Sequence, residues 1–175
     1  MSDWKKDKEW ADGVNSQVKA LLGQALIHES GNVDDAENNT DMMVFPSPRT
    51  GDACRIAVRV RNYKFFERYK HEFTIRSVRG SGILTELDKI LDGHGDYMFY
   101  GFKDASETGI AGYTIFDLRK FAEWYREEIK RPINFRVGNA DCILNRVWNH
   151  DKISGMDIFE WAWLPEGVII AQWLG

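Results

Sequence analysis

The stretch that decides the fold reads Thr40-Asp41-Met42-Met43-Val44-Phe45, then Arg55-Ile56-Ala57-Val58-Arg59-Val60-Arg61, then Glu72-Phe73-Thr74-Ile75-Arg76. Each piece alternates or clusters apolar residues as a β-strand does, and each also carries charge. Side chains two residues apart on a strand share a face, so Arg59 and Arg61 point to one side and Val58 and Val60 to the other. The pattern predicts a strand after Asp41 and strands near 54–61 and 71–77, with a site built on the sheet.

Length and composition favour one α/β domain over residues 1–175. The chain has 43% hydrophobic and 13% aromatic residues, enough to bury a sizeable core. Its net charge of -4 gives no global sign of a nucleic-acid-binding protein. Any phosphate contact must therefore come from a local basic patch, whose members are Arg55, Arg59, Arg61, Arg68, Lys70, Arg76 and Arg79.

The cysteines and the hydropathy pattern favour a reducing compartment. Cys54 and Cys142 lie far apart without the spacing of a zinc cluster or a disulfide framework, and both are predicted to be small buried residues. No basic start precedes an apolar run, and no run of membrane-spanning length occurs. We therefore expect a cytoplasmic protein with no membrane contact.

The remaining pattern predicts helices alternating with strands. A helix is expected over 4–27, a short one from Thr85 to Gly93, and one over 115–129 capped by Thr114. The nearly continuous apolar run 96–102 predicts a central strand buried on both faces. The polar segment 28–39 and the hairpin-like connection 46–52 are predicted to lie outside the core, and two tail strands are expected near 141–148 and 156–163.

This order of elements, with Asp41 at the head of a strand, resembles the core of the PD-(D/E)XK nuclease-like superfamily. The resemblance implies a restriction-endonuclease-like core, a central mixed sheet flanked by helices. It also implies an Asp at the start of one strand and an acid plus a lysine, one residue apart, on the next. In that family these groups bind a divalent metal and activate water, because Mg²⁺ takes hard oxygen ligands beside the scissile phosphate.

The second motif of that family would fall on Arg59-Val60-Arg61, and guanidinium groups neither ligate a metal nor act as a base. The missing groups could come from Glu86 and Lys89, which share a helix face at a spacing of three, or the acid could come from Glu29 or Glu72. This gives Asp41, Glu86 and Lys89 as candidate catalytic residues, with Asp41 and Glu86 as Mg²⁺ ligands. The alternatives are a solvated Glu86–Lys89 ion pair and a purely structural Asp41.

The arginines allow a second functional interpretation. If the strands near 54–61 and 71–77 pair, then Arg59, Arg61 and Arg76 form a cluster of forked donors suited to phosphate, a nucleic-acid-binding site. Nearby rings could stack on bases; they are Tyr63, Phe65, Phe66 and Tyr69. The alternative is that the arginines pair inside the fold with Glu72, Glu86 or Asp96.

A longer string resembles uncharacterised proteins of bacteriophages and mobile elements, which implies a bacterial host cell. The string comprises 74–77, 85–90, 93–96 and 100–102, and it adds Asp96 to the residues of interest. Scattered histidines, the absence of a Gly-x-Ser-x-Gly elbow and the lack of a Walker loop disfavour a zinc enzyme, a serine hydrolase and a nucleotide-dependent motor.

Two hypotheses follow from the sequence. The first is a protein that interacts with DNA or RNA, with a degenerate or migrated Mg²⁺-dependent nuclease site. The second is a catalytically inactive phage accessory protein that binds and inhibits a host defence or replication protein through segment 29–41 or the Trp-rich tail. Trp161 and Trp163, two apart on an expected strand, would share a face. If exposed, that face would contact a partner or a second copy in a homodimer.

Overall fold

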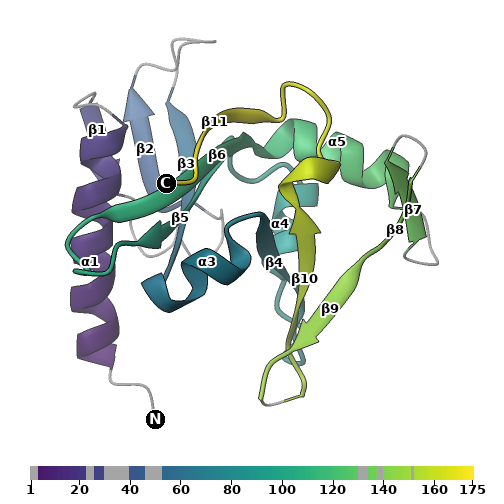
Figure 1. The fold of residues 1–175 in the computed structure, drawn as a ribbon, viewed down its shortest axis with the longest axis horizontal. Helices are drawn as coiled ribbons and strands as arrows, with labels where there is room; N and C mark the ends of the chain where they lie inside the picture. The colour runs from purple at the N-terminus through teal and green to yellow at the C-terminus, as the bar shows by residue number, and fades with distance from the viewer. Residues whose placement is uncertain are drawn as a thin grey trace.

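A six-stranded mixed sheet forms the middle of the protein (Figure 1). The computed structural model describes residues 4–22, 26–29, 40–45, 53–129, 134–137, 140–150 and 152–175. Within them the strands of this sheet, in spatial order, are β1 (Leu26–Glu29), β2 (Met42–Phe45), β3 (Cys54–Arg61), β5 (Tyr97–Lys103), β6 (Ile110–Asp117) and β11 (Ile169–Trp173). Only β3 and β5 pair in parallel among these described strands. The predicted α/β class with a mixed sheet is confirmed.

Strand β5 lies in the interior of the sheet, between β3 and β6, as its apolar sequence predicts. Its side chains are buried from Met98 onward. Phe99 faces one side, where it stacks on Tyr113, and Tyr100 faces the other, where it meets Phe73. A strand with both faces buried requires a covering layer on each side of the sheet.

Helix α1 (Trp4–Leu21) provides the first layer. Val14 and Val18 are buried against Met42, Ile56 and Phe99. The expectation of a helix to residue 27 was wrong, because the helix ends at Leu21 and residues 26–29 form β1. The sequence places Gly23 in between, and glycine is a poor residue for a helix interior.

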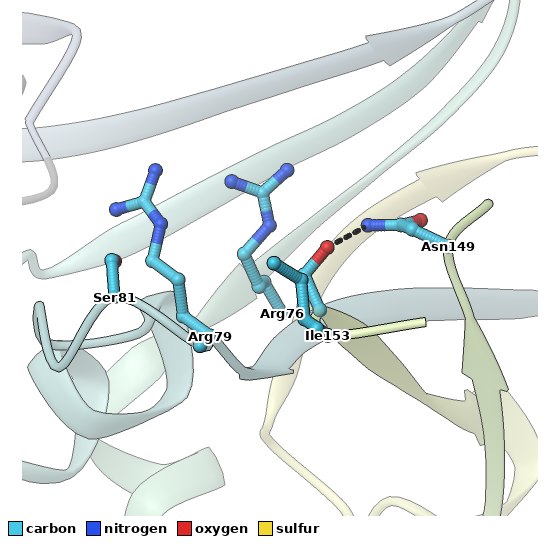
Figure 2. A pocket seen from close by; sticks show the side chains of 7 residues that line it. Arg76, Arg79, Ser81, Asn149 and Ile153 are labelled. Carbon is cyan, nitrogen blue, oxygen red and sulfur yellow. Dashed lines mark hydrogen bonds between the residues drawn. The ribbon is translucent and has the colours of Figure 1, made fainter. Parts of the chain in front are cut away.

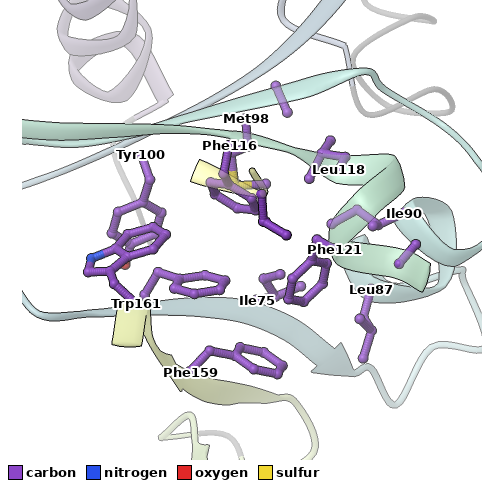
Figure 3. Packing of buried hydrophobic residues seen from close by; sticks show 14 of the residues in the cluster. Ile75, Leu87, Ile90, Met98, Tyr100, Phe116, Leu118, Phe121, Phe159 and Trp161 are labelled. Atoms are coloured by element: carbon purple, nitrogen blue, oxygen red, sulfur yellow. The ribbon is translucent and has the colours of Figure 1, made fainter. Parts of the chain in front are cut away.

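The second layer combines helices with a three-stranded antiparallel sheet. Its strands, in spatial order, are β4 (Glu72–Val78), β10 (Gly155–Glu160) and β9 (Asn145–Trp148), and its helices are α4 (Glu86–Leu91) and α5 (Leu118–Glu128). Figure 3 shows the aromatic and aliphatic side chains that fill the space between this layer and the middle sheet. Phe73 lies at the centre of the packing, with its ring centroid 4.2 Å from Trp161 and 5.1 Å from Phe116.

Strand β4 joins this second sheet and pairs with β10. The expectation that the strands near 54–61 and 71–77 are neighbours was therefore wrong. Between β3 and β4 the chain forms a 3₁₀ turn, Tyr63–Phe65, and the short helix α3, Phe66–Tyr69, and this connection carries β4 out of the middle sheet.

Helix α5 begins three residues later than expected. Residues 110–117 form β6, in which Thr114 is a buried strand residue. Asp117 caps the helix instead, and its carboxylate accepts hydrogen bonds from the N–H groups of Arg119 and Lys120. The predicted helix start near Thr85, which caps α4, and the predicted termination near Gly93 (φ 85°) are confirmed.

The C-terminal segment is more divided than expected. The strand predicted at 141–148 is two strands, β8 (Ala140–Ile143), which pairs with β7 (Asn134–Val137), and β9. After β10 the chain forms a 3₁₀ turn over Trp161–Trp163, so the two tryptophans do not share a strand face: Trp161 is buried and Trp163 partly buried.

Some expectations concern residues outside the described ranges. They include most of the polar segment 28–39 and the connection 46–52. Cys54 is buried, as predicted, whereas nothing is described of the Cys142 side chain. Among the described residues, no helix is both long and apolar enough to cross a membrane.

Candidate phosphate-binding pocket

Asp41 lies directly before β2 and contacts the neighbouring strand β3. Its backbone N–H donates to the Ile56 carbonyl at 3.0 Å, and its carboxylate oxygen Oδ2 accepts from the Val58 N–H at 2.5 Å. These contacts continue the pairing of β2 with β3 by one residue. Asp41 thus lies at the head of a strand, as the sequence predicted. Its carboxylate accepts a hydrogen bond from the β3 backbone.

Glu86, the first residue of α4, forms an ion pair with Arg59. Arg59 Nη2 lies 2.7 Å from Glu86 Oε2, and Arg59 Nη1 donates to the Thr74 carbonyl at 2.7 Å. The same Glu86 oxygen accepts the Arg76 backbone N–H at 3.0 Å. The expected alternative, pairing of an arginine with Glu86 inside the fold, is confirmed for Arg59.

The candidate metal ligands and Lys89 come from two elements: Glu86 and Lys89 belong to α4, and Asp41 directly precedes β2. Lys89 lies one turn along α4 from Glu86, on the side of the helix that their spacing predicts. Among the residues that the structure describes, no group of three or more His, Cys, Asp or Glu side chains could hold a metal ion. Any ligand role of Glu86 would also compete with the Arg59 guanidinium.

Arg61 is held by aromatic side chains. Its guanidinium carbon lies 4.8 Å from the Phe65 ring centroid and 5.0 Å from the Tyr69 ring centroid, distances typical of cation–π contacts. Arg61 Nη1 also lies 3.4 Å from the Tyr100 hydroxyl. Phe65 and Tyr69, which the sequence offered as stacking platforms for bases, thus contact Arg61 within the protein.

Asp96, at the start of β5, anchors neighbouring segments. Its carboxylate accepts from the Arg55 N–H at 2.9 Å and from the Arg119 guanidinium at 2.6 Å. Burial by itself raises the pKa of Asp96, but the hydrogen bonds and charges of Arg55 and Arg119 outweigh burial and lower the pKa below its usual value. Asp96 therefore connects the start of β5 to Arg55 of β3 and Arg119 of α5.

Arg76 and Arg79, at the end of β4, line a pocket of about 380 Å³. The other lining residues are Gly80, Ser81, Asn149, Ile153 and Ser154, so the lining contains no acidic residue. Figure 2 shows the two guanidinium groups side by side, extending in the same direction from the strand end. The Arg76 Nε atom is buried without a hydrogen-bond partner.

Within the described part of the chain, neither guanidinium forms a hydrogen bond or an ion pair. Arg76 and Arg79 differ in this respect from Arg59, which Glu86 neutralises, and from Arg61, which aromatic rings enclose. A guanidinium has five N–H donors and a permanent charge, so two of them beside one cavity favour an anion.

Two short segments form the walls of the pocket. One is residues 79–84, between β4 and α4, in which Gly80 lies so close to Ile153 that an added Cβ would be 3.1 Å from the Ile153 Cβ. The other is the turn between β9 and β10, where the Asn149 side chain donates to the Ser154 hydroxyl at 2.8 Å (Figure 2). Close packing and internal hydrogen bonds therefore hold both walls in place.

The sequence pointed to only part of this pocket. Arg76 was a predicted phosphate contact and Arg79 a member of the basic patch, but Asn149 and Ser154 lie about 70 residues further along the chain. The pairing of β4 with β10 brings these segments together, and no local pattern predicts that pairing.

Comparisons of the chain with protein families, with curated proteins and with solved structures gave no match.

Proposed function

We propose that the protein binds nucleic acid, and that the pocket between Arg76 and Arg79 holds a backbone phosphate. The observation that carries the proposal is the pair of guanidinium groups that form no hydrogen bond or ion pair with the described part of the chain, beside a cavity whose lining has no acid. Phosphate suits this site because its several oxygens can accept from both guanidinium groups at once. Ser81 and Asn149 add a hydroxyl and an amide to the lining.

The local character of the charge supports a salt-sensitive interaction. The protein carries a net charge of -4, so its overall field repels a polyanion. Binding must therefore depend on a few direct contacts. Each phosphate neutralised by an arginine releases counterions, which makes the affinity fall as salt rises.

We also propose that the middle sheet and its helices form a restriction-endonuclease-like core. The supporting features are the order α1, β1, β2, β3, β4, α4, β5, in which β4 leaves the middle sheet, the antiparallel run of the first three strands, and the parallel addition of β5 beside β3. The place of Asp41 before β2 adds to the resemblance. The arginines at 59 and 61 depart from it.

The contacts of Glu86 favour binding over cleavage. Its carboxylate is occupied by the Arg59 guanidinium and the Arg76 N–H. Mg²⁺-dependent cleavage by Asp41, Glu86 and Lys89 is the second candidate. It is favoured by the position of Asp41 directly before β2, where its carboxylate contacts the β3 backbone. In that candidate Asp41 and Glu86 would hold the metal and Lys89 would position water.

The binding proposal is tested by titrating labelled oligonucleotides over a range of salt concentrations. Arg79→Ala is expected to weaken binding about tenfold and to reduce the slope of log affinity against log salt by about 0.7 to 0.9, the loss of one phosphate contact. Arg76→Gln, which removes the charge and keeps the side chain as far as Cδ, is expected to act in the same direction.

Arg68→Ala is the matched control. It removes one positive charge from the exposed side of α3, outside the pocket lining. If Arg68→Ala weakens binding as much as Arg79→Ala, the nucleic acid responds to positive charge anywhere on the surface, and the pocket proposal is wrong.

A nuclease assay with Mg²⁺ or Mn²⁺ separates the two candidates. The binding proposal expects no metal-dependent cleavage by the wild-type protein. Cleavage that disappears in both Asp41→Ala and Glu86→Gln, with binding retained, would instead establish the second candidate.

A further inference from the structure

Ser81 lies in the wall of the pocket beside the two arginines. It is exposed, and its side chain extends in the same direction as the Arg79 guanidinium (Figure 2). Within the described part of the chain the Ser81 hydroxyl forms no hydrogen bond. An exposed serine hydroxyl is a group on which protein kinases place a phosphoryl group. At this position, that phosphoryl group would arrive beside two guanidinium charges without counter-charges.

The backbone around Ser81 leaves the hydroxyl accessible to a modifying enzyme. Residues 79–84 are exposed and belong to no helix or strand. Gly82 follows the serine with φ 70°, and a Cβ added to it would have no neighbour within 4 Å. Gly80, in contrast, packs closely against Ile153 and anchors the segment on the side of the pocket. The hydroxyl is thus open to solvent and held near the two guanidinium groups.

We propose that Ser81 is a phosphorylation site and that its phosphate, held by Arg76 and Arg79, closes the pocket to nucleic acid. The closing of the pocket rests on the proposed function, whereas the capture of the phosphate does not. Phosphoserine carries a charge of about -1.5 to -2 and three acceptor oxygens, and opposite a pair of arginines it forms charge-assisted hydrogen bonds.

The phosphoryl donor is a nucleoside triphosphate used by a protein kinase. The serine oxygen forms a bond to the γ-phosphorus, the bond from that phosphorus to the β-phosphate oxygen breaks, the nucleoside diphosphate leaves, and the hydroxyl proton passes to the base of the kinase. Arg76 and Arg79 precede Ser81 in the chain. Charge patterns around the acceptor residue are a feature by which kinases select their substrates.

A phosphate attached to the pocket wall has an advantage over one on a separate molecule. Only Gly80 separates Ser81 from Arg79 in the chain, and groups joined by a short linker meet at an effective concentration on the order of millimolar. The modification also changes the net charge of the protein from -4 to about -6, which repels a polyanion further. We expect the affinity for an oligonucleotide to fall at least about tenfold.

Genetically encoded phosphoserine in place of Ser81 tests the capture without any nucleic acid. Phosphorus NMR follows the titration of the phosphate, whose pKa is ordinarily about 6. Beside the two guanidinium groups this pKa is expected to fall to about 5. In the double variant Arg76→Gln, Arg79→Ala it should return toward its ordinary value, because the opposite charges are gone.

Phosphoserine in place of Ser106 is the matched control for binding. Ser106 is also exposed, but it lies between β5 and β6, outside the pocket lining. The control adds the same charge at another place on the protein. Titration of a fluorescein-labelled oligonucleotide should show the tenfold loss for phosphoserine at position 81 and a much smaller change at position 106.

A kinase reaction tests the modification site itself. The wild-type protein and Ser81→Ala are incubated with MgATP and a serine kinase that selects arginine before its serine, and mass spectrometry locates the phosphoryl group. The wild-type protein is expected to gain one at Ser81, and Ser81→Ala should gain none there. A wild-type chain that takes up no phosphate at Ser81 overturns the modification site.

The outcomes separate this inference from the function on which it partly rests. An arginine-dependent fall of the phosphate pKa, with loss of oligonucleotide binding specific to position 81, supports both. An ordinary pKa at position 81, or equal loss of binding at positions 81 and 106, overturns the inference and leaves the phosphate pocket standing. If the unmodified protein binds no oligonucleotide, the proposed function and the closing of the pocket both fail, while a lowered pKa would still establish the captured phosphate.

Discussion

Arginine side chains in this protein differ in role according to the groups within their reach. Arg59 is neutralised by Glu86, Arg61 is enclosed by rings, and Arg146 forms a two-pronged pair with Asp157. Arg76 and Arg79 have no such partner in the described part of the chain. Arg76 is partly buried and Arg79 is exposed, so the side chain of Arg76 carries the larger cost of leaving a guanidinium without a counter-charge.

Asp96 is expected to link stability to acid pH. Its folded-state pKa lies below the usual 3.8, so its contribution is complete above pH 3.8 and is lost as the pH falls through the folded-state pKa. Asp96→Asn should therefore lower the free energy of unfolding at pH 7. Urea titrations at several pH values should show this difference shrinking below pH 3.8. A difference that is constant with pH would contradict the assignment.

Glu72 is expected to show the opposite sign. Its pKa is raised above 4.5, chiefly by burial and further by Glu160, which lies directly opposite on β10, while Arg61 and Arg68 offset part of the effect. A raised pKa means that the favourable protonated state is fully populated below pH 4.5 and is lost as the pH rises through the folded-state pKa. Glu72→Gln should raise the melting temperature at pH 7 and have no effect below pH 4. Thermal scans at both pH values measure this, with Glu67→Gln as the exposed control.

At the scale of single residues, sequence alone offered the pairing of an arginine with Glu86 as one of several alternatives and could not choose among them. Arg59, Arg76 and Glu86 were all singled out as site residues, and all three meet around the Glu86 carboxylate. The sequence could not assign Glu86 to Arg59 in particular, because that pairing depends on where α4 packs. That position is set by contacts between segments distant in sequence.

At the scale of elements, the β9–β10 hairpin depends on one buried carboxylate. Asp157 is 1% exposed, and its two oxygens accept from Arg146 Nε at 2.6 Å and from Nη2 at 3.1 Å. The hydrogen bond and charge of Asp157 raise the pKa of Arg146 against the opposing effect of burial. The pair thus stabilises the edge strand β9, which ends at Trp148 and directly precedes Asn149.

Arg146→Met is expected to lower the free energy of unfolding by about 3 kcal/mol, because it leaves the Asp157 carboxylate buried and unpaired. The double variant Arg146→Met, Asp157→Leu should be less destabilised than the single one. Urea unfolding of the two single variants and the double variant measures the coupling. Strict additivity of the two changes would show that the pair does not act as a unit.

Elements with strong local signals were predictable, and those defined by their neighbours were not. The bounds of β3 match the predicted 54–61, and the helix start near Thr85 and the buried strand at the apolar run of β5 were also predicted correctly. The start of α5 was misplaced because Ile115 falls in phase with the helical stripe of Leu118, Phe121 and Ala122. The change from strand to helix at Asp117 occurs without a glycine or proline to mark it.

At the scale of the whole molecule, the aromatic layer under the middle sheet holds the two sheets together. Phe73 of β4 contacts rings from β5, β6, α5 and β10, and it is fully buried. Phe73→Ala is expected to lower the free energy of unfolding by about 4 kcal/mol through lost burial and a residual cavity. Ile170→Ala, at a half-exposed position on β11, should change it by less than about 0.5 kcal/mol. Equilibrium urea unfolding compares the two variants. Similar losses of unfolding free energy would show that Phe73 is not at the centre of the core.

The sequence predicted a mixed sheet flanked by helices, and the middle layer agrees. The sequence did not predict the second sheet. Strand β4 has the composition of any half-buried strand, and no local pattern indicates that it pairs with β10. The pocket could not be predicted for the same reason, since its walls come from segments that only the second sheet brings together.

The path of the chain between the two sheets constrains how the protein can fold during synthesis. In the described order the chain leaves the middle sheet after β3 for β4, returns for β5 and β6, leaves for β9 and β10, and returns for β11. The second sheet is complete only when β9 and β10 have left the ribosome, and the middle sheet only when β11 has. The nascent chain must therefore carry Phe73 uncovered until β10 and Trp161 have been synthesised, and such exposed apolar surface is prone to aggregate. Both sheets should then form late and together, as one cooperative unit.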